Sequence, residues 1–395
     1  MNRSRRMAKK EDEPRHFFVV AGEPSGDVLG AHLMAALRRV LGGSVRFSGV
    51  GGEHMRAEGL TSLFPLSEIA LMGPIAIARR LPAILRRIRE TSDAVSATDA
   101  DALIIIDSPE FTHRVARRVR RARPELAIID YVSPSVWAWR PWRARRMRAY
   151  VDHILALLPF EPDAHRRLGG PPCSYVGHPL AERIDALRGG STKPVGGPLL
   201  VVLPGSRITE VERLMAPFGD TVARVREVHP ELAVVIPAVD SVRAAIETGL
   251  KSWPVRPEIV SGEAAKLAAF HRARAALAAS GTVSLELALA RVPMVIAYRV
   301  ERLAVVLRPL LTVPSVVLPN LILGRNAVPE FIQERCTPEN LAAALLPLLK
   351  DSEERRAQLA AFDEVAARVA IGEETPSARA AREVLEVLRR RAPIS

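Results

Sequence analysis

Short runs of hydrophobic residues alternate along the chain with longer segments in which hydrophobic residues recur at helical spacing. Nearly continuous apolar runs are typical of strands buried in parallel sheets, so this alternation predicts an α/β fold with doubly wound (Rossmann-like) parallel sheets. The helix after the first run is expected over residues 27–41. The expected strands are residues 16–21, 45–50, 101–107, 126–132 and 153–158 in the first half and 198–206, 232–238, 273–280 and 292–299 in the second.

A polar stretch divides this alternation into two halves. Residues 187–198 read LRGGSTKPVGGP, and their glycine, proline and polar residues are typical of a linker. A chain of 395 residues is also long for a single core, so we expect two doubly wound domains that face each other across a cleft. The predicted parts are a loose basic tail at 1–15, an N-terminal domain at 16–186, the linker at 187–198, a C-terminal domain at 199–337 and a helical segment at 338–395.

The composition bounds the class of protein. Hydrophobic residues make up 48% of the chain, which is enough to fill two cores, yet no stretch of 18 residues lacks a charge, so a membrane-spanning helix is not expected. The N-terminal sequence MNRSRRMAKKEDEPRH is charged and lacks the apolar core of a secretion signal, which favours a cytoplasmic location. Cys173 and Cys336 lie far apart in the sequence and are expected to be reduced core residues.

The net charge indicates the kind of partner. A formal charge of +12 favours a polyanion, either a nucleic acid or an anionic membrane surface, although arginines that merely decorate solvated helix faces are the ordinary alternative. Two stretches combine arginine with apolar side chains. They are DYVSPSVWAWRPWRARRMR at 130–148, which holds three of the four tryptophans, and LMGPIAIARRLPAILRRIRE at 71–90. For the second stretch, an amphipathic helix packed on a core is the competing interpretation.

Two loops of the second half have the composition of a nucleotide-binding site. Ligands of open parallel sheets bind beyond the carboxyl ends of the strands, where LPGSRITEVERL at 203–214 begins. Gly205 and Ser206 form a tight turn into a helix whose free amides suit a phosphate. Arg207 adds a guanidinium that can hold a phosphate through two hydrogen bonds. A glycine–serine turn beside a solvated arginine is the alternative.

The second of these loops is ASGTVSLELAL at 278–288, which follows another predicted strand. Its small residues Ser280, Gly281 and Thr282 allow a ligand to approach closely and open a helix. Glu286, one turn inside that helix, can accept hydrogen bonds from two ribose hydroxyls, although a carboxylate that only caps the helix is the competing interpretation. Together the two loops indicate a site for a nucleoside diphosphate.

The corresponding loops of the first half carry acidic residues. In LIIIDSPEFTHR at 103–114, Asp107 directly follows a buried strand and is expected to be a partly desolvated general base, with an N-cap role for Asp107 or Ser108 as the alternative. The Asp-x-Asp pair of TDADA at 98–102 precedes that strand, at the wrong end of the sheet for a metal site. AGEPSGDVLGA at 21–31 departs from the dinucleotide fingerprint and brings to the crevice Glu23, Ser25, Gly26 and Asp27.

The motifs, in this order, closely resemble those of the bacterial lipid-A-disaccharide synthase family. The resemblance runs from residue 21 to 325, and its specificity comes from the combination. It implies an inverting GT-B-type glycosyltransferase without a metal or cofactor, which transfers 2,3-diacylglucosamine from its UDP conjugate to 2,3-diacylglucosamine 1-phosphate and yields a β-1,6-linked disaccharide and UDP. The motifs are AGEPSGDVLGA, IDSPEFT, YVSPSVWAWR, LPFE, VGHPL, LPGSRITEVE, ASGTVSLE, PMVIAYR and LPNLILGR.

The resemblance also implies roles for individual residues. Two loops depart from the commoner family patterns GEASGD and DAPDFN, because here they read GEPSGD and DSPEFT. These changes leave the fine geometry of the acceptor side open. The donor-side positions of the family are matched by Arg207, Glu286 and Asn320, the favoured base by Asp107, and the first-loop acids by Glu23 and Asp27.

Enzymes of this family handle diacylated sugars that reside in a bilayer. Such substrates call for apolar side chains beside acyl chains, arginines for phosphates and anionic lipid, and tryptophan at the interface. We therefore expect peripheral association with the cytoplasmic face of the inner membrane and no nucleic-acid partner, with a homodimer left open. The side chains expected to contact lipid are Leu71, Met72, Ile75, Ile77, Arg79, Arg80, Leu81, Trp137, Trp139 and Trp142.

Two other functions stay open at the level of sequence. A UDP-sugar epimerase or a different GT-B transferase would share the fold, act on water-soluble sugars and lack the apolar and basic surface of the first half. A nucleic-acid-binding protein would use the charge and the interleaved arginine and tryptophan. It would leave the paired nucleotide-type loops unexplained.

Overall fold

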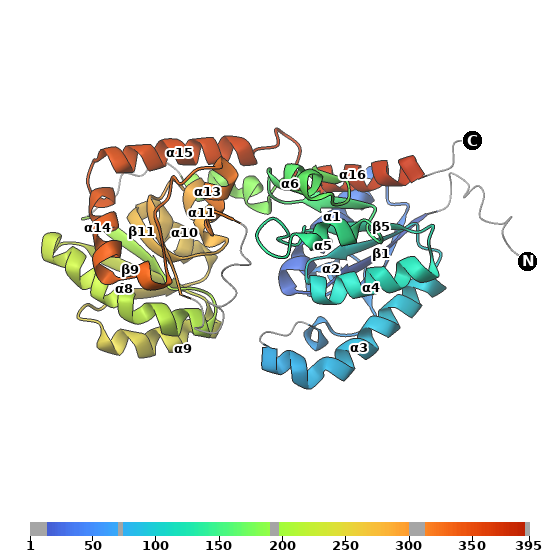
Figure 1. Ribbon diagram of the computed structural model, residues 1–395, viewed down its shortest axis with the longest axis horizontal. Helices are drawn as coiled ribbons and strands as arrows, with labels where there is room; N and C mark the ends of the chain where they lie inside the picture. The colour runs from blue at the N-terminus through green and yellow to red at the C-terminus, as the bar shows by residue number, and fades with distance from the viewer. Residues whose placement is uncertain (1–13, 70–73, 190–196, 300–312, 392–395) are drawn as a thin grey trace, which may run out of the picture. The chain divides into compact units, whose positions relative to one another are not determined.

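The computed structural model contains two compact units, each built on one parallel sheet (Figure 1). Unit 1 consists of the described residues up to His178 together with those from Ile371 onward. Unit 2 consists of the described residues from Pro179 to Ala370. The residues that the structure describes are 14–69, 74–189 (with the backbone only for 74–80), 197–299 and 313–391.

Unit 1 has a seven-stranded parallel sheet in the order β3-β2-β1-β4-β5-β6-β7. Val19 in β1 lies opposite Gly49 in β2 on one side and Ile104 in β4 on the other. The order of the strands reverses between β1 and β4, and ligands of such sheets bind beside this switch point. The strands are β1 (Arg15–Ala21), β2 (Val45–Val50), β3 (Thr61–Ser62), β4 (Ala102–Ile106), β5 (Ala127–Tyr131), β6 (His153–Ala156) and β7 (Cys173–Tyr175).

Hydrophobic cores lie on both faces of this sheet because neighbouring residues of a strand point to opposite faces. In β1, Phe18 and Val20 pack with residues of α3 and α4, whereas Phe17 and Val19 pack with residues of α1 and α16. Burial on both faces explains why the strands read as uninterrupted apolar runs. The helices are α1 (Pro24–Val40), α2 (Glu53–Ala57), η1 (Leu66–Glu68), α3 (Pro74–Ala97), α4 (Pro109–Ala122), α5 (Trp142–Met147), α6 (Glu161–Leu168) and α16 (Pro376–Arg391).

Unit 2 has a six-stranded parallel sheet in the order β10-β9-β8-β11-β12-β13, which reverses between β8 and β11. Residues of α8, α9 and α14 form one continuous core with this sheet. The strands are β8 (Leu199–Leu203), β9 (Ala233–Ala238), β10 (Glu258–Ser261), β11 (Ala273–Ala279), β12 (Met294–Tyr298) and β13 (Glu330–Ile332). The helices are η2 (Pro179–Arg183), α7 (Ile184–Arg188), α8 (Ile208–Val228), α9 (Asp240–Gly249), η3 (Leu250–Ser252), α10 (Glu263–Arg272), α11 (Val283–Leu289), α13 (Leu318–Leu323), η5 (Gln333–Arg335), α14 (Pro338–Leu349) and α15 (Glu353–Val369).

The last helix, α16, belongs to unit 1, whereas α14 and α15 belong to unit 2. Ala380, Ala381 and Val384 are fully buried in the core that α16 shares with α1. The structure therefore divides the helical segment that was expected as one part at 338–395. The change of unit along the chain falls after His178, ahead of the polar stretch that was expected to be the linker.

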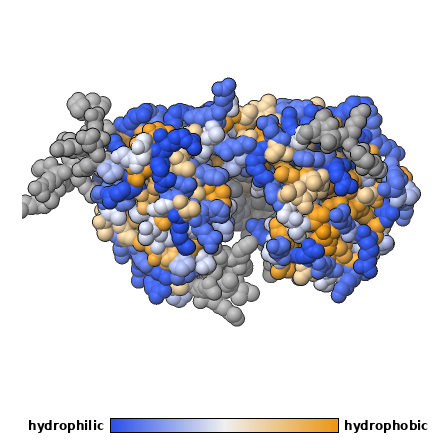
Figure 2. All heavy atoms as spheres, turned by 180° about the vertical axis from the view of Figure 1, so that it is seen from behind, coloured by the Kyte–Doolittle hydropathy of each residue, from blue (hydrophilic) through white to orange (hydrophobic). Residues whose placement is uncertain are grey.

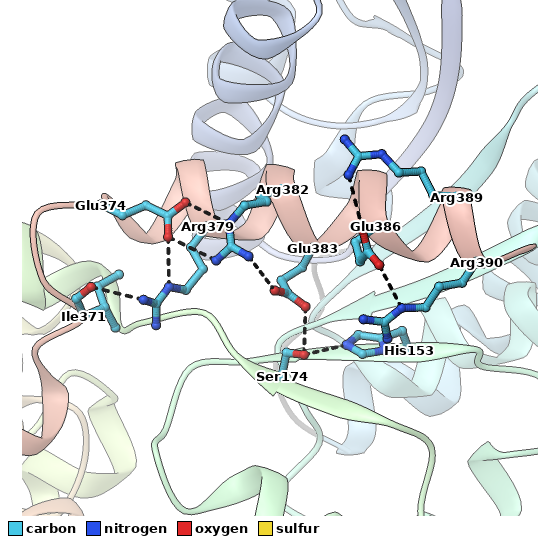
Figure 3. Close-up of polar contacts among 10 residues, drawn as sticks. All are labelled: His153, Ser174, Ile371, Glu374, Arg379, Arg382, Glu383, Glu386, Arg389 and Arg390. Atoms are coloured by element: carbon cyan, nitrogen blue, oxygen red, sulfur yellow. Dashed lines mark hydrogen bonds and ion pairs between the residues drawn. The ribbon is translucent and has the colours of Figure 1, made fainter.

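Polar contacts hold α16 in place as well (Figure 3). Glu383 on α16 accepts a 2.9 Å hydrogen bond from the hydroxyl of Ser174 on β7, and that hydroxyl lies 2.9 Å from Nε2 of His153 on β6. Ahead of the helix, Glu374 accepts a 3.1 Å hydrogen bond from Arg379. α16 is thus an integral part of unit 1.

Candidate functional site

Unit 2 contains a cavity of about 570 Å³ at the carboxyl ends of its central strands. It lies beside β8 and β11, where the order of the strands reverses, which is the place that doubly wound sheets use for ligands. Both loops that the sequence predicts for a nucleotide line this cavity. The residues that line it are Leu203, Gly205, Ser206, Arg207, Glu210, Pro237, Ala238, Val239, Asp240, Val260, Gly262, Glu263, Lys266, Ala279, Ser280, Gly281, Thr282, Val283 and Glu286.

The loop after β8 is shaped around Glu210. Gly205 has a φ of 124°, and a Cβ there would lie 2.6 Å from a carboxylate oxygen of Glu210, so the position requires glycine. Glu210 accepts hydrogen bonds from the amide of Ser206 (3.2 Å) and from Nη1 of Arg207 (2.9 Å). The side chain of Arg207 is still 62% exposed, so its guanidinium can reach a ligand in the cavity.

The loop after β11 brings Ser280, Gly281 and Thr282 to the cavity, as predicted. The hydroxyl of Ser280 donates a 2.7 Å hydrogen bond to the carbonyl of Val316, which fixes the loop. Glu286 lies one turn inside α11, and its carboxylate accepts a 2.8 Å hydrogen bond from Nζ of Lys266.

Four charged residues of the cavity were missed in the sequence analysis: Glu210, Asp240, Glu263 and Lys266. Glu210 lies three residues after Arg207, which is the spacing of a capping box and the one signal that could have identified it. Lys266 also lies 3.0 Å from Glu263. Burial works to lower the pKa of Lys266, but its bonds to Glu286 and Glu263 outweigh burial and hold that pKa above its ordinary value. Lys266 therefore stays charged and holds Glu286 at the cavity wall.

Asn320 does not line this cavity. Its side chain is buried, donates a 2.9 Å hydrogen bond to the carbonyl of Val328, and accepts 2.9 Å hydrogen bonds from the amides of Ala327 and Val328. These bonds stabilise the turn after α13. Asn320 is therefore buried outside this cavity, and its role in donor binding stays a prediction.

In unit 1, the loops after β1 and β4 meet at the switch point of the sheet. A Cβ on Gly22 would lie 2.1 Å from the Cβ of Ser108, so these loops can pass each other only with glycine at that position. Asp107 and Ser108 have positive φ angles of 55° and 45°, a conformation that is costly for residues with a side chain. The hydroxyl of Ser25 lies 3.4 Å from Oδ2 of Asp107, so the two loops bring together two predicted residues.

The carboxylate of Asp107 is partly exposed and remains open to a ligand. Oδ1 accepts a 2.7 Å hydrogen bond from the amide of Ser108, and the side chain of Ser108 makes no capping bond to α4. Oδ2 has the long contact to Ser25. The alternative of an N-cap side chain at Ser108 is therefore not supported by the structure.

Asp27 has a different role from the one expected of it. It is buried, and its carboxylate accepts hydrogen bonds from the amides of Gly52 (2.6 Å), His54 (3.0 Å) and Met55 (3.1 Å) at the start of α2. Burial alone would raise the pKa of Asp27, but these hydrogen bonds outweigh it and lower that pKa. Asp27 caps a helix, and Gly26 is buried beside Ile106, whereas Glu23 and Ser25 are exposed.

The three tryptophans of the arginine-rich stretch lie in different environments. The indole of Trp137 donates a 3.0 Å hydrogen bond to the buried carboxylate of Glu161 and packs edge-on against Phe160. Trp139 is half-buried and has the guanidinium of Arg140 over its ring. Trp142 is 48% exposed and lines an open cavity with Arg145, Arg146 and Arg167. Of the three, Trp142 is the one whose side chain is exposed, whereas Trp137 and Trp139 are half-buried.

The second predicted lipid-contacting stretch is part of α3. Leu81 and Leu85 are exposed, whereas Ile88 is buried in the core of unit 1, so this part of the helix is amphipathic. No helix in the described ranges is both long and apolar enough to cross a membrane. On the face seen in Figure 2, hydrophilic residues surround scattered hydrophobic patches. Leu71 and Met72 lie outside the described residues, and the same holds for the side chains of Ile75, Ile77, Arg79 and Arg80.

Within the part of the chain that the structure describes, no three histidine, cysteine, aspartate or glutamate side chains are arranged to hold a metal ion. The Asp-x-Asp pair lies at the amino ends of the strands, where Asp99 binds His16 and Arg46, and Asp101 binds Arg15.

A family model described as lipid-A-disaccharide synthetase matches residues 17–384. The lipid-A-disaccharide synthase of Nitrobacter hamburgensis is 55% identical over 95% of this chain and 96% of its own length. Those of Rhodopseudomonas palustris strain HaA2 and Bradyrhizobium diazoefficiens are 54% and 50% identical, over 95% and 97% of this chain and 97% and 99% of their own lengths.

Solved structures share the fold at low sequence identity. The UDP co-structure of MnaA from S. aureus has a TM-score of 0.60 at 12% identity and covers 95% of this chain and 96% of its own. The calicheamicin glycosyltransferase CalG4 has a TM-score of 0.59 at 17% identity and covers 96% and 100%. The fold is therefore that of GT-B glycosyltransferases and related epimerases. With a family match over nearly its whole length and relatives above 50% identity, this chain belongs to the lipid-A-disaccharide synthetase family.

Proposed function

We propose that this protein transfers 2,3-diacylglucosamine from its UDP conjugate to 2,3-diacylglucosamine 1-phosphate, with inversion, and forms the β-1,6-linked lipid A disaccharide 1-phosphate. Membership of the family supports the class of reaction. The main support for this proposal is the cavity of unit 2. It brings the guanidinium of Arg207 and the carboxylate of Glu286 together at the switch point of a parallel sheet.

In this proposal the cavity of unit 2 binds the UDP part of the donor. Arg207 and the first free amides of α8 hold the diphosphate, and Glu286 accepts hydrogen bonds from the ribose hydroxyls. Negative charge grows on the β-phosphate as UDP departs, and the guanidinium and the helix amides stabilise this charge. Lys266 keeps Glu286 in position.

Asp107 of unit 1 acts as the general base. It takes the proton of the acceptor 6-hydroxyl while that oxygen forms a bond to the anomeric carbon of the donor. The bond from this carbon to the β-phosphate oxygen breaks, its electron pair leaves with UDP, and the sugar passes through an oxocarbenium-like state. Glu23 and Ser25 line the acceptor side.

The test is an assay of the purified full-length chain with both diacylated sugars. We expect release of UDP that requires the acceptor, and a disaccharide product by mass spectrometry. Release of UDP without the acceptor, or epimerisation of a water-soluble UDP-sugar, would contradict the proposal and favour an epimerase. Inversion is tested by the coupling constant of the new anomeric proton in NMR.

The proposal includes peripheral binding to an anionic bilayer. Trp142 with Arg145 and Arg146, and Leu81 with Leu85 on α3, are exposed groups of the kind that enter a lipid interface. Sedimentation with vesicles that contain anionic phospholipid is expected to remove the wild type from solution and the Trp142→Ser variant to a smaller extent. Equal sedimentation of both proteins, or tighter binding to a single-stranded oligonucleotide at physiological salt, would contradict this part.

A further inference from the structure

Unit 1 contains a small cavity, lined largely by residues of the stretches at 103–114 and 130–148. It has a volume of about 90 Å³ and lies between the first half of α4 and the segment from Pro134 to Tyr150. It is close to Asp107, because α4 begins two residues after this aspartate and Pro109 is part of the cavity wall. The residues that line it are Pro109, Glu110, His113, Arg114, Arg117, Pro134, Arg143, Met147 and Tyr150.

The inner wall of this cavity is a fixed polar network. His113 and Tyr150 are both buried, and Nδ1 of His113 lies 3.0 Å from the hydroxyl of Tyr150. Arg117 donates a 3.2 Å hydrogen bond to the same hydroxyl, and its guanidinium stacks 4.8 Å from the centre of the tyrosine ring. Behind this wall, Oδ2 of the fully buried Asp130 lies 3.2 Å from Nε2 of His113. The network holds the guanidinium of Arg117 in place at the cavity.

The cavity carries an excess of positive charge. Three arginines line it, namely Arg114, Arg117 and Arg143, and Glu110 is the one carboxylate among the residues of its wall. Glu110 lies 2.5 Å from Nη2 of Arg143 and 3.7 Å from Nη2 of Arg114. One carboxylate cannot neutralise three guanidinium groups, so the cavity attracts a small anion, and planar guanidinium groups match the oxygens of a phosphate.

We propose that this cavity binds the phosphate monoester of the acceptor sugar and thereby selects phosphorylated acceptors. This inference rests on the proposed function. A phosphate monoester carries a charge of about −1.5 to −2 and three acceptor oxygens, so it can take the place of Glu110 beside Arg143 while Arg114 and Arg117 complete its hydrogen bonds.

The position of the cavity suits this role. With a rise of about 1.5 Å per residue, Arg114 and Arg117 lie about 8 and 12 Å along α4 from its first residue, Pro109. Side chains of a helix lean toward its N-terminus, which here brings both guanidinium groups back toward Asp107. A bound phosphate and the base Asp107 are then separated by roughly one sugar ring, as the 1-phosphate and the 6-hydroxyl of the acceptor require.

The test compares two acceptors, 2,3-diacylglucosamine 1-phosphate and the same sugar without its phosphate, with the wild-type full chain and the Arg117→Ala variant. A charge-assisted hydrogen bond contributes about 1.5–3 kcal/mol. We therefore expect kcat/KM for the phosphorylated acceptor to fall about tenfold to a hundredfold, mainly through KM, with KM for the donor unchanged. For the sugar without phosphate, kcat/KM should stay the same. Arg118→Ala is the matched control, because Arg118 is exposed on the same helix beside Asp93 and should leave both values unchanged.

Equal losses with both acceptors would contradict the inference, since a merely structural role of Arg117 does not distinguish them. If Arg117→Ala lowers the melting temperature, the measurement is repeated with Arg114→Ala, whose side chain is largely exposed and has only a long contact to Glu110. Wild-type protein that uses both acceptors equally also overturns the phosphate site while the proposed function stands. Wild-type protein that releases no UDP with either acceptor refutes the proposed function, and this inference with it.

Discussion

Two aspartates, Asp27 and Asp107, show how much a residue's role depends on its surroundings. Asp107 directly follows β4, and Asp27 lies in the first turn of the helix after β1. The sequence predicted Asp107 as the general base and Asp27 as an acceptor-side residue. In the structure Asp27 is buried and caps α2, just after the end of β2, whereas one carboxylate oxygen of Asp107 lies beside Ser25 and is open to a ligand. The capping role of Asp27 depends on α2 packing against the start of α1, and no local sequence pattern encodes that contact.

We expect Asp107→Asn to lower kcat by about 10²–10⁴-fold, because an amide of the same shape cannot accept the proton of the acceptor hydroxyl. KM for the donor should change little. Steady-state kinetics of UDP release measure both values. Turnover near that of the wild type in a folded Asp107→Asn protein would show that another group is the base.

Asp27→Asn is the matched comparison and should act on stability. Loss of the charged cap is expected to reduce the free energy of unfolding by about 1–2 kcal/mol at pH 7 while kcat stays within a few-fold of the wild type. The pKa of Asp27 is lowered in the folded state, so this contribution is present above its ordinary value of 3.8 and is lost as the pH falls through the folded value. If Asp27→Asn lost activity without losing stability, Asp27 would instead have a role in the acceptor site.

Arg207→Ala should weaken the binding of UDP about tenfold to a hundredfold, because it removes a charge-assisted contact worth about 1.5–3 kcal/mol. Isothermal titration calorimetry measures this directly. Arg224→Ala is the control, since Arg224 lies on the same helix, is exposed and pairs with Glu339 outside the cavity. An unchanged affinity of Arg207→Ala for UDP would show that Arg207 does not contact the diphosphate.

Glu161 provides a prediction on pH. Burial raises its pKa to about 7, against the opposing hydrogen bonds from the amide of Leu158 and the indole of Trp137. A carboxyl group whose pKa is raised on folding loses stability as the pH rises from its ordinary value of 4.5 to about 7. A shift of this size corresponds to about 3 kcal/mol.

The Glu161→Gln variant lacks this titration. Its free energy of unfolding relative to the wild type should therefore increase by about 3 kcal/mol between pH 4.5 and pH 7.5, as measured by urea denaturation. Asp163→Asn, which changes an exposed carboxylate of the same helix, is the control. A constant difference between Glu161→Gln and the wild type across this range would contradict the raised pKa.

At the scale of elements, the inner strands of each sheet could be predicted from the sequence, whereas the strands at the sheet edges could not. All nine expected strands are present within three residues of the predicted ends. Burial on both faces gives most of them an uninterrupted apolar run, although β2 includes the exposed Arg46. The short strands β3, β7, β10 and β13 were not expected. β10 shows the reason, since Glu258 and Ser261 are exposed and the strand has no continuous apolar signal.

The cavity of unit 2 was predictable for the same reason. Its two loops follow strands with strong signals, and parallel topology brings the carboxyl ends of neighbouring strands together. Lys266 could not be found this way, because it lies on a helix that follows the weak strand β10. The position of Asn320 was not predictable either, since its partners at 327 and 328 are set by the turn after α13.

At the scale of the whole chain, the return of α16 to unit 1 links the two ends of the sequence. The helical periodicity of this segment is a local property and was predicted. The surface on which its apolar stripe packs depends on contacts with residues more than 300 positions away, in α1. For this reason the predicted helical segment at 338–395 joined α16 to α14 and α15, its neighbours along the chain.

Val384→Asp tests this arrangement. A carboxylate introduced at this fully buried position is expected to destabilise unit 1 by about 4 kcal/mol or more. The affinity for UDP should remain, because the cavity lies in unit 2. Thermal unfolding and UDP titration are the measurements, with Arg389→Asp on the exposed side of the same helix as the control. Loss of UDP binding in Val384→Asp, with unit 1 still stable, would contradict the assignment of α16 to unit 1 and of the UDP cavity to unit 2.

We propose that unit 2 binds the nucleotide, whereas unit 1 provides the base and the acceptor site. Hydrogen–deuterium exchange of the full chain with and without UDP tests this proposal most directly, because a bound ligand slows exchange of the amides that it contacts or orders. We expect protection of peptides that cover residues 204–213, 262–267 and 280–288, with no change at 21–27 and 107–117. Protection confined to the loops of unit 1 would contradict the proposal.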